Sequence, residues 1–103
     1  MTHSVTVYGF GSTFDDAKAA RDVDLLVVHQ VTDLASCQLA IECKRRLAKS
    51  IERAHITMLS EAEEEHFEFI KTAGAVRLGA IREDYFNVDL TALDAELHKL
   101  GAR

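Results

Sequence analysis

The sequence lacks several features that define large classes of proteins. Its 103 residues include only two cysteines, and its 12 basic residues are outnumbered by 17 acidic ones, for a net charge of -5. This acidic balance argues against a protein that grips nucleic acid through a basic face. No apolar run approaches the roughly 20 residues that span a bilayer, so we expect no membrane-spanning helix. The first residues carry no basic region of the kind that opens a signal peptide.

The two cysteines, Cys37 and Cys43, lie six positions apart on one predicted helix. At about 100° per residue they point to different faces, so they cannot form a disulfide with each other. Small, partly buried thiols in a reducing compartment are the simplest interpretation. We therefore expect a cytoplasmic protein.

The chain also lacks internal repeats, low-complexity tracts and linkers, and its length suits one small domain. We expect the order β-β-α-β-α-β-α: an α/β (α+β) fold with a small mixed sheet of about four strands, two long helices and a C-terminal helix. The predicted strands cover 4–10, 22–28, 54–59 and 75–79, and the predicted helices cover 33–53, 60–74 and 89–100. We divide the chain into a main domain, 1–82, and a helical tail, 83–103.

Local signals mark the ends and buried sides of the predicted helices. Thr32 or Asp33 can cap the first helix, Ser60 and Glu63 form a capping box for the second, and Asp89 can cap the tail. The second helix is expected to turn Phe67 and Ile70 inward and to end at Gly74. The predicted apolar positions are Leu34, Cys37, Ile41, Ala48 and Ile51 in the first helix, and Leu90, Leu93, Leu97 and Leu100 in the tail. The leucines can pack within the chain or on a partner.

One group of residues in the N-terminal part of the chain could bind a metal ion and a phosphate. The first strand ends in Gly11 and Ser12, and after a polar excursion Asp22 and Asp24 open the second strand. Alternation along a strand places the two carboxylates on one face, about 6.5 Å apart. The two carboxylates repel each other unless a divalent cation binds between them. Mg²⁺ commonly uses one or two carboxylates together with substrate phosphates. Gly11, without a Cβ, permits close approach of a phosphate, and Ser12 offers hydroxyl and amide donors.

These residues, in GFGSTFDDAKAARDVDLLVV, resemble the signature of minimal nucleotidyltransferases of the DNA polymerase beta superfamily: an apolar strand ending in G-S, then D-x-D-L. The resemblance covers about residues 4–80. It implies nucleotidyl transfer with two Mg²⁺ ions held by Asp22 and Asp24, and with the triphosphate of ATP or another NTP held by Gly11 and Ser12. In one branch of the family an antitoxin transfers AMP to a HEPN-type ribonuclease toxin, so the resemblance also implies a protein partner.

One residue of the third predicted strand distinguishes between two hypotheses about function. Aligned with the family, this strand carries His55 where a third catalytic carboxylate is expected, with Glu52 and Glu61 flanking the strand. Imidazole is a poorer Mg²⁺ ligand than a carboxylate oxygen. The first hypothesis is an active transferase that uses Asp22, Asp24 and His55. The second is a degenerate nucleotidyltransferase fold that acts as a binding or regulatory subunit. A homo-oligomer is compatible with both.

Overall fold

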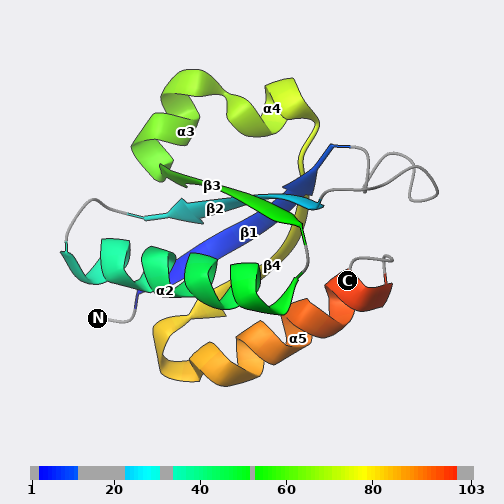
Figure 1. Cartoon of the computed structure of the whole chain (residues 1–103). Coiled ribbons are helices and arrows are strands. Elements are labelled where there is room, and N and C mark those ends of the chain that lie inside the picture. Colours follow the sequence, from blue (N-terminus) through cyan, green and yellow to red (C-terminus); the bar gives the residue numbers. More distant parts are fainter. Residues whose placement is uncertain (1–2, 12–22, 31–33, 52, 100–103) are drawn as a thin grey trace.

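The computed structural model of the chain describes residues 3–11, 23–30, 34–51 and 53–99. Figure 1 shows a sheet with helices on both of its faces. The strands are β1 (Ser4–Phe10), β2 (Val23–His29), β3 (Ala54–Ser60) and β4 (Val76–Arg82). The helices are α2 (Leu34–Ser50), α3 (Glu61–Phe67), α4 (Phe69–Ala73) and α5 (Phe86–Lys99), with a 3₁₀ turn η1 (Glu83–Tyr85) before α5. The predicted caps Thr32 and Asp33 lie outside the described residues.

The strands form one mixed sheet in the order β3-β2-β1-β4, which confirms the predicted fold class. β1 is antiparallel to both β2 and β4, whereas β2 and β3 are parallel. The parallel pair requires a crossover, and α2 supplies it. β2 is buried at six of its seven positions, as expected for a central strand covered on both faces.

The core lies on one face of the sheet, where α2 and α5 pack side by side (Figure 1). Inward-facing side chains from all four strands contribute to it, because alternate strand residues point to the same face. Its buried members from the strands are Val5, Val7, Val23, Leu25, Val27 and Ile81. None of the helices in the described residues combines the length and apolar content needed to cross a membrane.

The apolar stripe predicted for α2 is wrong in register. The buried side of the helix consists of Ser36, Leu39, Ala40, Cys43 and Leu47. Leu34 is 73% exposed and Ile41 is 53% exposed, and of the five predicted positions only Ile51, just after the helix, is buried. Two sets of apolar residues recur at helical spacing along α2. The sheet and α5 together cover the set that contains Leu39, Cys43 and Leu47, and not the predicted set.

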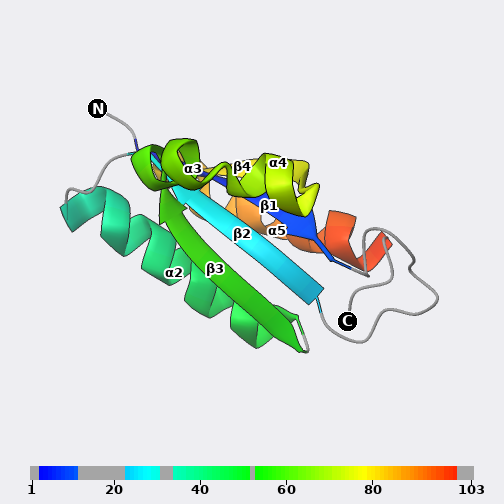
Figure 2. The same ribbon diagram turned by 90° about the horizontal axis from the view of Figure 1, so that it is seen from above.

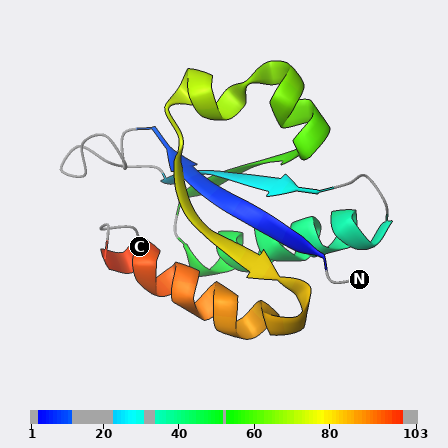
Figure 3. The same cartoon turned by 180° about the vertical axis from the view of Figure 1, so that it is seen from behind.

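The C-terminal leucines pack within the chain. Leu90, Leu93 and Leu97 belong to the same core as β1 and β2, and α5 runs alongside β4 (Figure 3); Leu100 lies outside the described residues. Asp89 is not the N-cap that the sequence predicts, because α5 already begins at Phe86. Its carboxylate instead accepts three hydrogen bonds of 2.9 Å from the backbone and guanidinium of Arg82, which lower the pKa of Asp89 to about 2.

The opposite face of the sheet carries α3 and α4, as Figure 2 shows from above. The predicted capping box is confirmed: Glu63 N donates to Ser60 Oγ at 3.1 Å, and Ser60 N donates to Glu63 Oε1 at 2.9 Å. These hydrogen bonds lower the pKa of Glu63. Glu68, in the left-handed conformation, breaks the predicted single helix in two. Phe67 is consequently 59% exposed, not inward as predicted, and Gly74 ends α4 as predicted.

Candidate functional site

The end of β1 and the beginnings of β2 and β3 meet at one end of the sheet. Phe10 of β1 is directly opposite Asp24 of β2, and Asp24 is in turn opposite His55 of β3. Neighbouring strands lie about 4.8 Å apart, so the three residues form a row across the sheet. Gly11 follows Phe10 at the same end of the sheet.

The row lies on the face that carries α3 and α4. Val23 and Leu25, on either side of Asp24, both belong to the core on the other face. Ala54 and Ile56, on either side of His55, pack against that same core. Since side chains alternate along a strand, Asp24 and His55 project together to the opposite face. Asp24 is partly exposed and His55 is exposed, so solvent reaches both side chains.

Gly11 makes room for the Asp24 carboxylate. Its backbone has φ +82°, in the region that favours glycine, and a Cβ built at this position would lie 2.4 Å from Asp24 Oδ2. No other residue type fits this contact without displacing the carboxylate or the backbone. The sequence predicts that Gly11 lets a phosphate approach the backbone. The structure adds that this glycine also admits the side chain of the predicted metal ligand.

An aromatic pair stands beside the carboxylate. Phe10 packs edge-to-face on Phe69 of α4, with ring centroids 5.1 Å apart and planes at 81°. α4 therefore reaches down to the sheet next to Asp24. The sequence pattern did not predict this contact. Strand alternation could have placed Phe10 on the face of Asp24, but the position of Phe69 depends on the helix break at Glu68.

Arg53 is a second residue that the sequence analysis missed. It is exposed, occupies the turn before β3 with φ 58°, and its carbonyl accepts a hydrogen bond from Val23 N at 3.1 Å. This bond joins the beginnings of β2 and β3 just before Asp24 and His55. A guanidinium at this end of the sheet suits a polyphosphate, which arginine binds through several donors.

Some of the residues predicted to form the site lie close together in the structure. It brings Gly11, Asp24 and His55 together, whereas Ser12 and Asp22 lie outside the described residues. Glu61 follows the opposite end of β3, six residues from His55 and roughly 20 Å along the strand, so it does not replace the third carboxylate within the chain. Glu52 is also outside the described residues. Within the described ranges, no three histidine, cysteine, aspartate or glutamate side chains form a metal-binding group.

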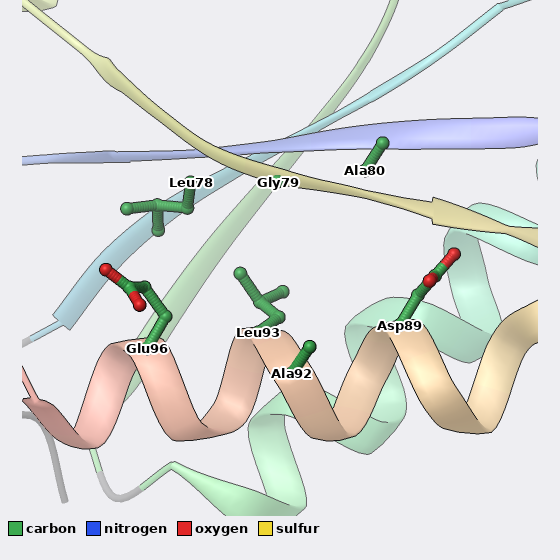
Figure 4. Close-up of a pocket in the computed structure, with 7 residues that line it drawn as sticks. All are labelled: Leu78, Gly79, Ala80, Asp89, Ala92, Leu93 and Glu96. Atoms are coloured by element: carbon green, nitrogen blue, oxygen red, sulfur yellow. The ribbon is translucent and has the colours of Figure 1, made fainter.

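A groove on the other side of the sheet offers different chemistry. It has a volume of about 250 Å³ and lies between β4 and α5 (Figure 4). Its lining consists of Leu78, Gly79, Ala80, Asp89, Ala92, Leu93 and Glu96. Arg82 already engages Asp89, and the remaining lining is apolar or small apart from Glu96. Because Arg82 already engages one of its two carboxylates and no cation or nucleophilic hydroxyl or thiol lines it, this groove is a weaker catalytic candidate than the Asp24 end of the sheet.

The row Phe10–Asp24–His55, with Gly11 beneath the carboxylate, is thus the candidate site. It places one carboxylate and one imidazole on neighbouring strands, both at least partly exposed, at one end of the sheet. No family model, no curated protein and no solved structure matches the chain.

Proposed function

We propose that this protein is a nucleotidyltransferase of the minimal type, which transfers AMP from ATP to a hydroxyl on a partner protein. The partner proposed from the family resemblance is a HEPN-type ribonuclease toxin, with this chain as its antitoxin. One observation carries the proposal. Asp24, His55 and Gly11, which the sequence motif singled out separately, lie together on one face at one end of the sheet.

Each residue has a proposed role. Asp24, with Asp22, would hold Mg²⁺, which supplies charge neutralisation and alignment of the phosphates. Gly11 and Ser12 hold the triphosphate, and Arg53 adds a cation at the same end of the sheet. The acceptor hydroxyl attacks the α-phosphorus, the bond to pyrophosphate breaks, and the hydroxyl proton passes to the His55 imidazole. Pyrophosphate leaves, and the partner carries AMP.

The test uses ATP labelled at the α-phosphate. The purified protein is incubated with Mg²⁺ or Mn²⁺, alone and together with any protein that co-purifies with it, and label on protein is measured. Asp24→Asn should lower transfer by about 100-fold or more, since even the outer-shell partners of metal ligands are worth about 10- to 100-fold. Glu61→Gln is the matched control: it also neutralises one exposed carboxylate, but at the far end of β3. Transfer that survives Asp24→Asn would refute the site assignment.

The degenerate hypothesis remains the second candidate, and one observation favours it. An imidazole, and not a carboxylate, occupies the position opposite Asp24. A binding subunit would retain ATP, measured by calorimetry, without transferring label. His55→Asp then separates the two candidates. Activity that appears only in His55→Asp identifies a site that has lost its third carboxylate, whereas activity lost in His55→Asp and His55→Ala supports the imidazole as base.

A further inference from the structure

The two edges of the sheet are protected very differently. β4, at one edge, carries the exposed Arg77 and Arg82, and the pairing between β1 and β4 contains a register shift at Val7 and Tyr8. Exposed cations and bulges are devices that prevent edge strands from pairing with other chains. β3, at the other edge, reads AHITMLS and contains no lysine, arginine, aspartate, glutamate or proline. Among the described residues, no strand covers its outer side.

An exposed apolar stripe of α2 accompanies this edge. It consists of the exposed Leu34 and Ile41 with the half-buried Cys37 between them, and together with the outer side of β3 we call it the β3–α2 flank. Arg46 lies 5.6 Å from the Phe86 ring centroid and Ser50 Oγ donates to Asp94 Oδ1 at 2.6 Å, so these residues mark the side of α2 that faces α5. At 100° per residue, Ile41 lies about 180° from Ser50 and about 140° from Arg46. The stripe thus faces away from α5, and α2 runs along the outer side of β3 (Figure 2).

We propose that the β3–α2 flank binds the same flank of a second copy of this chain, with the two β3 strands antiparallel about a two-fold axis near Thr57. Such an interface is isologous, so the flank must complement itself. In full overlap of the two strands, Thr57 is opposite Thr57 and Ile56 is opposite Met58. Both are favourable cross-strand pairs, and no like charges meet along the strands. Ile41, at the middle of α2, packs below on its counterpart.

The dimensions of the flank set the strength of this dimer. β3 is seven residues long, or about 23 Å, and a strand over a helix of 10–12 Å diameter is about 15 Å deep. Each copy therefore contributes a strip of roughly 350 Å², and the pair roughly 700 Å², below the standard size of stable interfaces. We expect a reversible dimer with a dissociation constant in the micromolar range or weaker, as for small, transient interfaces.

The pairing also changes the surroundings of the candidate site. With the axis at Thr57, Leu59 of the partner subunit lies opposite His55 on the same face of the joined sheet. Dimerisation then covers the outer side of His55 and leaves Asp24 between β1 and β3. The dimer itself does not depend on the proposed enzymatic function, because it rests on the edge and the stripe alone.

Sedimentation velocity of the full chain over about 1 to 200 μM, a range that covers micromolar dissociation constants, tests the proposal. The wild-type weight-average mass should rise from monomer toward dimer. Ile41→Lys and Thr57→Lys change exposed side chains on the flank, and each should raise the dissociation constant by at least about 10-fold. Val88→Lys is the matched control, because Val88 is 67% exposed on α5, away from the flank, and should leave the constant unchanged.

Hydrogen exchange identifies independently which edge strand of the sheet, β3 or β4, forms the dimer interface. Exchange of β3 amides should slow as the protein concentration rises, while exchange of β4 amides should stay constant. Circular dichroism of Ile41→Lys and Thr57→Lys confirms that each variant is folded. A wild-type protein that is monomeric throughout the range would overturn the proposal. So would a dimer that both flank variants leave intact, or one in which concentration protects β4 instead of β3.

Discussion

At the scale of single residues, Gly11 and Asp24 are the best-defined contact of the candidate site. Gly11→Ala adds a Cβ that meets Asp24 Oδ2 at 2.4 Å and must also adopt φ +82°. The left-handed backbone costs about 1–2 kcal/mol for a residue with a Cβ, and turning the Asp24 carboxylate off its rotamer adds about 0.5–1.5 kcal/mol. We therefore expect Gly11→Ala to lower the free energy of unfolding by about 1.5–3.5 kcal/mol, measured by urea denaturation.

Two further variants separate the causes. Gly74 has φ +65° and nothing within 4 Å of an added Cβ, so Gly74→Ala should show the backbone cost alone. In an Asp24→Ala background the overlap at Gly11 disappears, and Gly11→Ala should then cost about as much as Gly74→Ala. Equal costs of Gly11→Ala with and without the Asp24 side chain would contradict the contact.

The residue scale also shows why only part of the site is predictable from the sequence. Gly11, Asp24 and His55 each stand at a strand end, and strand ends are marked by local signals such as β-branched runs and glycine. Phe69 could not be assigned to the site, because it reaches Phe10 only through a left-handed turn at Glu68. A glutamate in that conformation leaves no signal in the sequence, since non-glycine residues rarely adopt it.

At the scale of elements, α2 shows the limit of periodicity. Its existence and approximate span follow from helical spacing and composition, but two apolar sets satisfy that spacing. The choice between them depends on α5, which comes some 40 residues later and covers the side with Leu39 and Cys43. The capping box and the first three strands, by contrast, were predicted to within one residue because short-range sequence determines them, whereas β4 runs on to Arg82, beyond its predicted end at 79.

Alanine substitutions test the register of α2 directly. Leu47 is fully buried, so Leu47→Ala should lower the free energy of unfolding by about 2–5 kcal/mol through lost burial and the remaining cavity. Leu34→Ala, at the exposed position that the sequence pattern placed in the core, should change it by less than about 0.5 kcal/mol. Urea denaturation at low protein concentration keeps the chain monomeric. A larger effect at Leu34 than at Leu47 would restore the original register.

The joint between β4 and α5 predicts a dependence of stability on pH. Hydrogen bonds from Arg82 lower the pKa of Asp89 to about 2, whereas an aspartate in an unfolded chain titrates near 3.9. The folded chain therefore binds this proton less readily. The stabilisation is fully present above about pH 4 and is lost as the pH falls toward about 2.

Thermal denaturation between about pH 5 and pH 2, which spans both pKa values, measures this effect. The difference in melting temperature between the wild type and Asp89→Asn should shrink as the pH falls through this range. Glu96→Gln, an exposed carboxylate two turns further along α5, is the control and should track the wild type. A constant difference between the wild type and Asp89→Asn would show that the pair does not contribute through ionisation.

At the scale of the whole molecule, a single core contains residues from all four strands, α2 and α5, and Cys43 is fully buried in it. Burial raises the pKa of the Cys43 thiol to about 12, so the reactive thiolate is scarce in the folded state and the sulfur is also inaccessible. Alkylation of Cys43 therefore requires the core to open. With α5 and the sheet both packed over this helix, the opening should be the global unfolding of the domain.

In a Cys37→Ser background, the alkylation rate of Cys43 is followed by mass spectrometry. This rate should be proportional to the equilibrium population of the unfolded chain. Leu97→Ala removes a core side chain of α5, far from Cys43 in sequence, and costs about 2–5 kcal/mol. It should accelerate alkylation by about 30-fold or more, since 1.4 kcal/mol is tenfold. The exposed Val88→Ala should leave the rate unchanged. If Leu97→Ala lowers the stability measured in urea without accelerating alkylation, then α2 opens independently of α5 and the domain is not one cooperative unit.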